Sequence, residues 1–176
     1  MQRILELARE IGFTTVSPLN MAALAIRSEV RDMCAGDRCL SYGRNWSCPP
    51  ACGTLEVCEK RISAYRCGVL VQTTGKMEDD FDAQTIGDTY LRHKAAFETL
   101  ARQTRALRPN CLPLTAGACM LCRKCTYPDR PCRFPGKRLS SMEAYGLLVS
   151  DVCVKSGVKY NYGAKTITYT SCVLFD

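Results

Sequence analysis

The chain has 176 residues, 24 Lys and Arg against 17 Asp and Glu for a formal net charge of +7, a single histidine and 13 cysteines. With 47% hydrophobic residues it can bury an ordinary core, so the cysteines are not needed as disulfides for folding, and an odd number leaves one unpaired in any all-disulfide scheme. The first ten residues lack the apolar run of a signal peptide and no stretch is long enough to span a membrane, so we expect a cytoplasmic protein whose thiolates bind metal.

The first half of the chain predicts three helices and one strand. Apolar residues at helical spacing within residues 4–11 predict the first helix. A second helix is expected from a cap at Asn20 to about Val30, and a third from a cap at Thr54 to about Tyr65. Residues 67–73 form a short, continuous and β-branched run, which is typical of a buried strand.

The second half predicts a long helix followed by two strands and two short helices. The long helix runs from Asp82 to about Arg108, and its apolar stripe must face the core: Ile86, Tyr90, His93, Phe97, Leu100, Thr104 and Leu107. Strands are expected at residues 111–115 and 166–175. Short helices are expected near Glu143, after Ser140 or Ser141, and over residues 147–156.

Strands that alternate with helices predict an α/β (or α+β) fold with a small mixed sheet. We expect one cysteine-rich metal-binding domain over residues 1–176. Nine of the cysteines fall in two loops, residues 34–58 and 117–136, which are rich in Gly and Pro. A metal site needs several thiolates to converge, and irregular loops allow this better than a regular helix or strand. The two loops are therefore the candidate metal sites.

In the second loop, two residues separate Cys119 from Cys122, and two more separate Cys122 from Cys125. Three thiolates at this spacing can bind three corners of an iron-sulfur cube, as the first three cysteines of bacterial ferredoxins do. The fourth ligand is either Cys132, which follows Cys125 after six intervening residues, or Cys111. Four thiolates also satisfy zinc, which is the main alternative. Three cysteines in one turn would crowd a single tetrahedral ion, so the spacing favours a cluster.

The first loop has a less regular spacing. We expect Cys34, Cys39 and Cys48 to bind together, with Cys52 or Cys58 completing four ligands. Cys58 falls in a predicted helix, so Cys52 and Cys58 need not both be ligands. The two prolines that follow Cys48 resemble the proline that follows cluster cysteines in ferredoxins.

Four segments of the chain resemble an uncharacterised prokaryotic family of predicted metal-binding, cysteine-rich proteins found in anaerobic bacteria and archaea. They are CLSYGRNWSCPP (39–50), CMLCRKC (119–125), CRFP (132–135) and SMEAYG (141–146). The resemblance covers nearly the whole chain and implies metal binding, without naming a reaction. It supports oxygen-sensitive iron-sulfur clusters, and it implies the following motif positions: Cys39, Cys48, Cys119, Cys122, Cys125 and Cys132.

The sequence lacks the motifs of several other classes of protein. One histidine excludes a His-rich metal site, a CxxCH haem attachment and a Ser-His-Asp triad, and His93 lies on the apolar stripe of the long helix, where a core role is expected. No GxGxxG motif follows a strand and no Walker GxxxxGK motif is present. The CxxxCxxC motif of radical S-adenosylmethionine enzymes is also missing. Trp46, the only tryptophan, is either a core residue or a shield beside a cluster.

Basic residues gather around both cysteine loops, at positions 31, 38, 44, 123, 124, 130, 133, 137 and 138. Such a pattern can mark nucleic-acid binding, as in basic zinc modules. Alternatively, it compensates the negative charge of the metal sites, since four thiolates leave a [4Fe-4S]²⁺ core or a zinc ion at 2−. We favour compensation because the charges follow the cysteines and do not form one helical face, so nucleic acid is not the expected partner.

The leading hypothesis is an iron-sulfur protein that holds two [4Fe-4S] clusters and passes single electrons to a partner redox protein. The second hypothesis is a zinc-stabilised module that binds nucleic acid or an acidic protein. The third is an enzyme in which one cluster has an open iron site for substrate. The sequence leaves open the two fourth ligands, the redox partner, any substrate and the oligomeric state.

Overall fold

The two longest strands pair with each other along their whole length. In a computed structural model that describes residues 1–176, β2 (Cys67–Lys76) lies antiparallel to β5 (Thr166–Phe175) over ten residue pairs. β1 (Thr15–Pro18) adds antiparallel to β2, and β3 (Cys111–Thr115) adds antiparallel to β5. β4 (Ser140–Ser141) pairs in parallel with β3, which gives the order β1-β2-β5-β3-β4. The fold is therefore α+β with a mixed sheet, as the sequence predicts.

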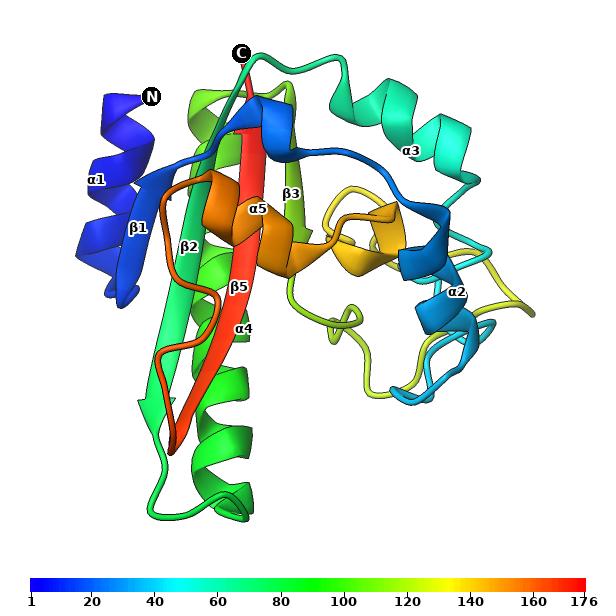
Figure 1. The fold of residues 1–176 in the computed structure, drawn as a ribbon. Helices are drawn as coiled ribbons and strands as arrows, with labels where there is room; N and C mark the ends of the chain where they lie inside the picture. Colours follow the sequence, from blue (N-terminus) through cyan, green and yellow to red (C-terminus); the bar gives the residue numbers. More distant parts are fainter.

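Helices cover both faces of this sheet (Figure 1). α1 (Gln2–Ile11) and α4 (Ala83–Leu107) pack on one face and contact each other. The other side carries three shorter helices: α2 (Ser28–Ala35), α3 (Leu55–Ile62) and α5 (Val149–Lys155). Strand alternation explains the two layers, because successive side chains of a strand point to opposite faces. In β2, Val69 and Val71 enter the core beneath α1 and α4, whereas Leu70 enters the core beneath α3 and α5.

The predicted elements agree with the structure except at several boundaries, including the end of β2 at Lys76, and in the two short strands β1 and β4, which the sequence did not predict. Asn20 does cap a helix, but only the 3-10 turn Met21–Ala23, and α2 begins separately at Ser28. The Thr54 side chain caps α3 as expected, although the helix ends at Ile62 and not near residue 65. β1 has only four residues, which are too few to show the alternation of apolar and polar residues that marks a strand, and the sequence did not predict it.

His93 of α4 is fully buried, which agrees with the core role expected from the apolar stripe. Its two ring nitrogens lie 2.9 Å from the Thr73 hydroxyl of β2 and 2.7 Å from the Ser171 hydroxyl of β5. Burial, together with the smaller effect of the nearby Lys94 charge, lowers the pKa of His93 from its ordinary value of 6.5 to about 3. The imidazole is therefore neutral in the fold and ties the long helix to the two central strands.

Acid should destabilise the fold through His93. Between pH 6.5 and about 3 the unfolded chain binds a proton that the folded chain excludes, so the free energy of unfolding decreases as the pH falls through this range. Between pH 7 and pH 5 we expect the titration of His93 to lower the free energy of unfolding by about 2 kcal/mol. Urea denaturation at both pH values measures the difference. The His93→Gln variant, which keeps a polar side chain without this titration, should lack that part of the slope, and an equal slope in both proteins would contradict the assignment.

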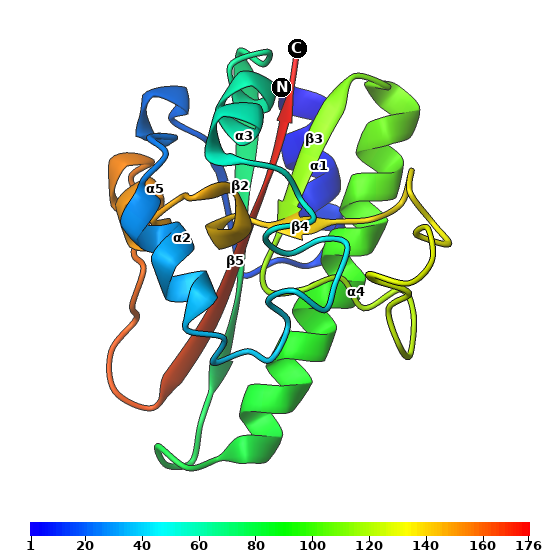
Figure 2. The same ribbon diagram turned by 90° about the vertical axis from the view of Figure 1, so that its right-hand side faces the viewer.

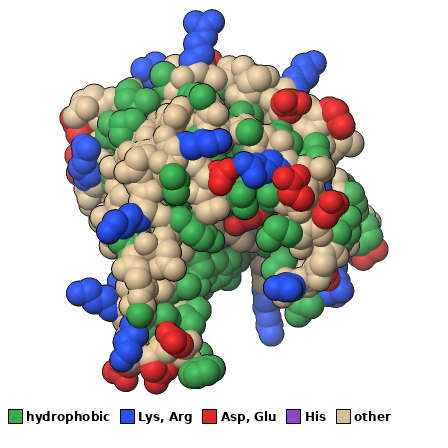
Figure 3. Space-filling model, in the orientation of Figure 1, with side chains coloured by type: hydrophobic (Ala, Val, Ile, Leu, Met, Phe, Trp, Pro, Cys, Tyr) green, Lys and Arg blue, Asp and Glu red, His purple; other side chains and the backbone are tan.

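The two cysteine loops lie together at the β3–β4 edge of the sheet, beyond the end of β3. Figure 2, which faces this side, shows the segment that follows α2 crossing between α2 and the loop that leads into β4. In Figure 3 the surface is notched between this part of the molecule and the projecting end formed by the β2–α4 connection. None of the helices is both long and apolar enough to cross a membrane.

Candidate metal centre

All four cysteines of the second loop line one small hollow, which we call site two. Cys119, Cys122, Cys125 and Cys132 are half-buried around a space of about 20 Å³. Cys111, the other predicted candidate, begins β3 and packs against the core beneath α1 and α4, whereas the loop leaves from the other end of that strand. The geometry thus groups Cys132, and not Cys111, with the three closely spaced cysteines.

A buried lysine supports the start of the second loop. Lys94 of α4 is 4% exposed and donates through Nζ to the Thr115 hydroxyl and the Ala116 carbonyl, both at 3.2 Å, and to the Ala118 carbonyl at 2.9 Å. Burial lowers its pKa, and the negative charges of Cys119, Glu98 and Cys48 oppose that effect. This cation therefore lies near thiols of both cysteine loops.

Trp46 covers site two from the first loop. Its backbone N–H donates to Cys125 Sγ at 3.4 Å, and its indole N–H donates to the Arg130 carbonyl at 3.0 Å. The ring meets Tyr127 edge-on, with centroids 4.9 Å apart. An N–H donor to a ligating sulfur is a contact that tunes the potential of a cluster. Of the two roles considered for Trp46, its position favours the shield.

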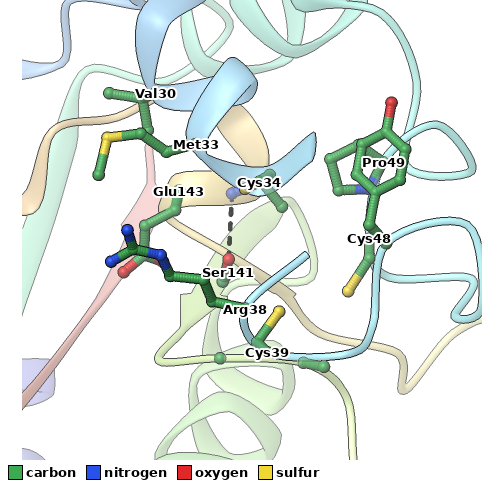
Figure 4. A pocket seen from close by; sticks show the side chains of 13 residues that line it. Val30, Met33, Cys34, Arg38, Cys39, Cys48, Pro49, Ser141 and Glu143 are labelled. Carbon is green, nitrogen blue, oxygen red and sulfur yellow. Dashed lines mark hydrogen bonds between the residues drawn. The ribbon is translucent and has the colours of Figure 1, made fainter. Parts of the chain in front are cut away.

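Three cysteines of the first loop line a second, larger cavity, which we call site one. Cys34 lies in the last turn of α2, Cys39 lies in the loop that follows, and Cys48 precedes two prolines; the cavity has a volume of about 250 Å³. In Figure 4 the thiols of Cys39 and Cys48 point toward one another. Glu143, from the 3-10 turn after β4, and Arg38 line the same cavity.

The thiols of site one affect one another electrostatically. The pKa of Cys48 is raised to about 11, mainly by burial; a hydrogen bond with Ser47 opposes this effect, and the charges of Cys39, Cys34 and Cys119 add to it. Burial also raises the pKa of Cys34, followed by the charges of Glu143 and Cys39. The three thiols and the carboxylate are therefore close enough to repel when all are ionised, and a bound cation would relieve that repulsion.

Cys52 and Cys58 lie outside the lining of site one and form a pair with each other. A hydrogen bond from Cys52 lowers the pKa of the Cys58 thiol to about 7 despite its burial, and raises the pKa of Cys52. Arg31 stabilises the pair by donating to Cys58 Sγ at 3.5 Å and to the Gly53 carbonyl at 3.0 Å. The Cys52 thiol also donates to the Ala144 carbonyl at 3.5 Å. Thr54 explains this arrangement, because it caps α3, which begins three residues after Cys52, and Cys58 then lies on the face of the helix that enters the core.

One short segment connects the two sites. From the first loop, Asn45 donates through its amide nitrogen to the Cys119 carbonyl at 3.2 Å, and the Ser47 hydroxyl accepts from the Cys119 N–H at 3.0 Å. Ser47 is also 3.7 Å from Cys48 Sγ of site one. The segment from Asn45 to Cys48 therefore touches site two through Asn45, Trp46 and Ser47 and ends in a thiol of site one.

Seven thiols line two neighbouring hollows, and thiolates are the donor groups that an iron-sulfur cluster or a zinc ion would need. No group of three or more His, Cys, Asp or Glu side chains lies close enough in the structure to hold a single metal ion. Sequence reasoning missed Glu143 and Lys94 as members of this region. Lys94 lies four residues after Tyr90 and three before Phe97, so it falls on the apolar stripe of the long helix. A charged residue on that stripe is the feature of the sequence that could have indicated a buried cation.

Comparison with known proteins assigns the chain to a family. Residues 17–175 match the family described as "Predicted metal-binding protein (DUF2284)". The chain belongs to this family. The match confirms the resemblance seen in the four motifs, and membership in DUF2284 supports metal binding without specifying the metal or a reaction. No curated protein and no solved structure matches the chain.

Binding of a coloured cluster at site two should quench the fluorescence of Trp46, the only tryptophan. The reason is its contact with Cys125, since an absorbing centre at that distance accepts the excitation energy. The emission of the apoprotein should fall severalfold as iron and sulfide are restored under anaerobic conditions. The Cys125→Ser variant, treated in the same way, should keep more of its emission than the wild-type protein, because only the cluster at site one remains to quench it. Equal quenching in both proteins would show that the absorbing centre is not at site two.

Proposed function

We propose that the protein is a cytoplasmic two-cluster iron-sulfur protein that passes single electrons to a partner redox protein. The observation that carries this proposal is the Asn45–Cys48 segment, which contacts Cys119 and Cys125 of site two and ends in Cys48 of site one. Two metal centres held by one segment are neighbours, and neighbouring centres allow an electron to pass between them. Metal binding itself agrees with the family.

The chain's own groups have separate roles in this function. The thiolates of sites one and two hold the clusters, while the Trp46 N–H and the buried Lys94 ammonium stabilise negative charge near them. Arg38 lines site one, and Arg133 and Arg138 line site two. These positions support charge compensation as the role of the basic residues, because their cations lie at the hollows where thiolate charge accumulates.

The surface beside site two offers a place for the partner. Met120 and Phe134 are large apolar side chains with 48% and 41% of their surface exposed. Next to them Arg123, Lys124 and Arg133 line an open hollow that also contains Cys122. Exposed apolar residues ringed by cations suit a transient partner with an acidic rim, because complementary charge raises the rate of encounter. Electrons would then enter or leave through site two.

Anaerobic purification followed by iron, sulfide and zinc analysis tests the function. Two [4Fe-4S] clusters predict about eight iron and eight sulfide per chain. Reductive titration should then show one-electron steps in the electron paramagnetic resonance of the protein. Stoichiometric zinc without sulfide would contradict the proposal and favour the zinc-stabilised module, whose binding to nucleic acid would weaken steeply with salt.

A further inference from the structure

A third hollow lies between α4 and the loop that leads into β4, and we call it the basic groove. Its volume is about 480 Å³, which falls in the range of roughly 300–1,000 Å³ that is usual for small-molecule sites. In Figure 2 this loop lies beside α4. Leu121 lines both the basic groove and site two, so the two hollows are neighbours.

Three cations line the basic groove from its two sides. Arg102 and Arg105 lie one turn apart on α4, and Lys137 comes from the facing loop. Glu98 is the one carboxylate in the lining, and none of the four side chains forms an ion pair. Like charges at this helical spacing repel one another, so the cations destabilise the fold unless an anion joins them.

The thiolates of site two do not account for these cations. Arg133 and Arg138 line site two, whereas Arg102, Arg105 and Lys137 line the basic groove and not site two. Their positive charge therefore faces a different hollow, in which the chain supplies only one negative group. The missing counter-charge points to an anionic ligand that comes from outside the chain.

The rest of the lining is apolar, and this narrows the class of ligand. Leu121 and Leu139 line the groove, together with two alanines of α4. Inorganic phosphate alone would leave this apolar surface in water, and a purely apolar ligand would leave the cations without a partner. Guanidinium groups bind phosphate oxygens through paired N–H donors. A phosphate attached to a ring system matches both parts of the lining.

The groove differs from the glycine-rich phosphate sites whose motifs the sequence lacks. Those sites hold phosphate mainly with backbone N–H groups at the start of a helix. Here the donors are side chains on the last turns of α4 and in an irregular loop, and no sequence motif marks such a pair of segments. Absence of the motifs therefore does not exclude this mode of binding.

We propose that the basic groove binds a mononucleotide. Its phosphate is held by Arg102, Arg105 and Lys137, and its ring lies against Leu121 and Leu139. The inference goes beyond the proposed function, because the groove contains no thiol and does not depend on which metal occupies site two. Binding is non-covalent, and no group is transferred.

Isothermal titration calorimetry of the anaerobically purified protein tests the proposal, with AMP and flavin mononucleotide as probes. At least one of them should bind at one site per chain, about tenfold more tightly than inorganic phosphate or adenosine, which each supply half of the contacts. Arg102→Gln and Lys137→Gln should each weaken this binding about tenfold, since each removes a charged donor to phosphate. Glu98→Gln should strengthen it severalfold, because it removes the one repelling charge.

Arg92→Gln is the matched control. Arg92 is also an exposed arginine of α4, but it does not line the basic groove, so its loss should leave the affinity unchanged. Arg102 and Lys137 are exposed as well, so we expect all three variants to fold as the wild type does.

Three results would overturn the inference. The first is the absence of saturable binding of both nucleotides. The second is an equal loss of affinity in Arg92→Gln and Arg102→Gln, which would indicate attraction by net charge alone. The third is binding of inorganic phosphate as tightly as the nucleotides, which would leave the apolar lining without a role. None of these results changes the iron and sulfide content, so the proposed function is tested separately.

Discussion

The Cys125→Ser and Cys39→Ser variants should each lose one cluster and keep the other. Cys125 lines site two and Cys39 lines site one, and no cysteine lines both hollows. Each variant should therefore contain about half of the wild-type iron and sulfide, with the resonance of one cluster missing. Serine is a much poorer ligand for iron than a thiolate, so the loss should be nearly complete at the altered site. Metal analysis and spectra of the purified variants provide the measurement.

Cys111→Ser is the matched control for this pair. Cys111 is half-buried, as Cys125 is, but begins β3 and packs against the core. It should retain both clusters. Loss of all metal from either Cys125→Ser or Cys39→Ser would indicate one shared centre in place of two, and full metal in either would show that its cysteine is not a ligand.

Removal of the buried cation should lower the reduction potentials of both clusters. Lys94→Met keeps the length of the side chain and deletes the charge that acts on Cys119 and Cys48. Reduction adds negative charge, so it becomes less favourable without the ammonium, by on the order of 50 mV. Redox titration followed by electron paramagnetic resonance measures both potentials in the same sample.

The stability of the apoprotein separates this electrostatic role from a structural one. Lys94→Met removes three hydrogen bonds to Thr115, Ala116 and Ala118, and it also removes the cost of burying a charge. We expect these effects to offset each other largely in the apoprotein. Lys60→Met, on the exposed surface of α3, should leave both potentials unchanged. Unaltered potentials in Lys94→Met would mean that this cation does not act on the clusters.

Prediction from the sequence was most accurate for elements and sites that are defined by residues close together in the chain. β3 and β5 begin and end at the predicted residues, and α4 lies within one residue of its predicted ends at Asp82 and Arg108, because a cap and a long apolar stripe define it. The grouping of Cys119, Cys122, Cys125 and Cys132 also followed from spacing, since these cysteines occupy a single loop.

The remaining features depend on contacts between distant segments. Glu143 is about a hundred residues from Cys34 and Cys39, and only the β3–β4 pairing and the turn after it bring its side chain to their cavity. Likewise, Cys52 and Cys58 were candidates for the first site because they are close in sequence, but α3 directs Cys58 into the core and Cys52 pairs with it. Apart from the helix predicted at Cys58, a single sequence contains no local signal for either outcome.

The position of β5 has a consequence for the order of events during synthesis. β5 is the last strand of the chain, yet it lies between β2 and β3 in the sheet. β3 has no strand partner other than β5 and the two-residue β4, so it cannot join the sheet until residues 166–175 have left the ribosome. The second cysteine loop follows β3 directly, and the segment from Asn45 to Ser47 has no Cys119 to contact before then. Both sites should therefore be loaded only after β5 has been synthesised and has paired with β3.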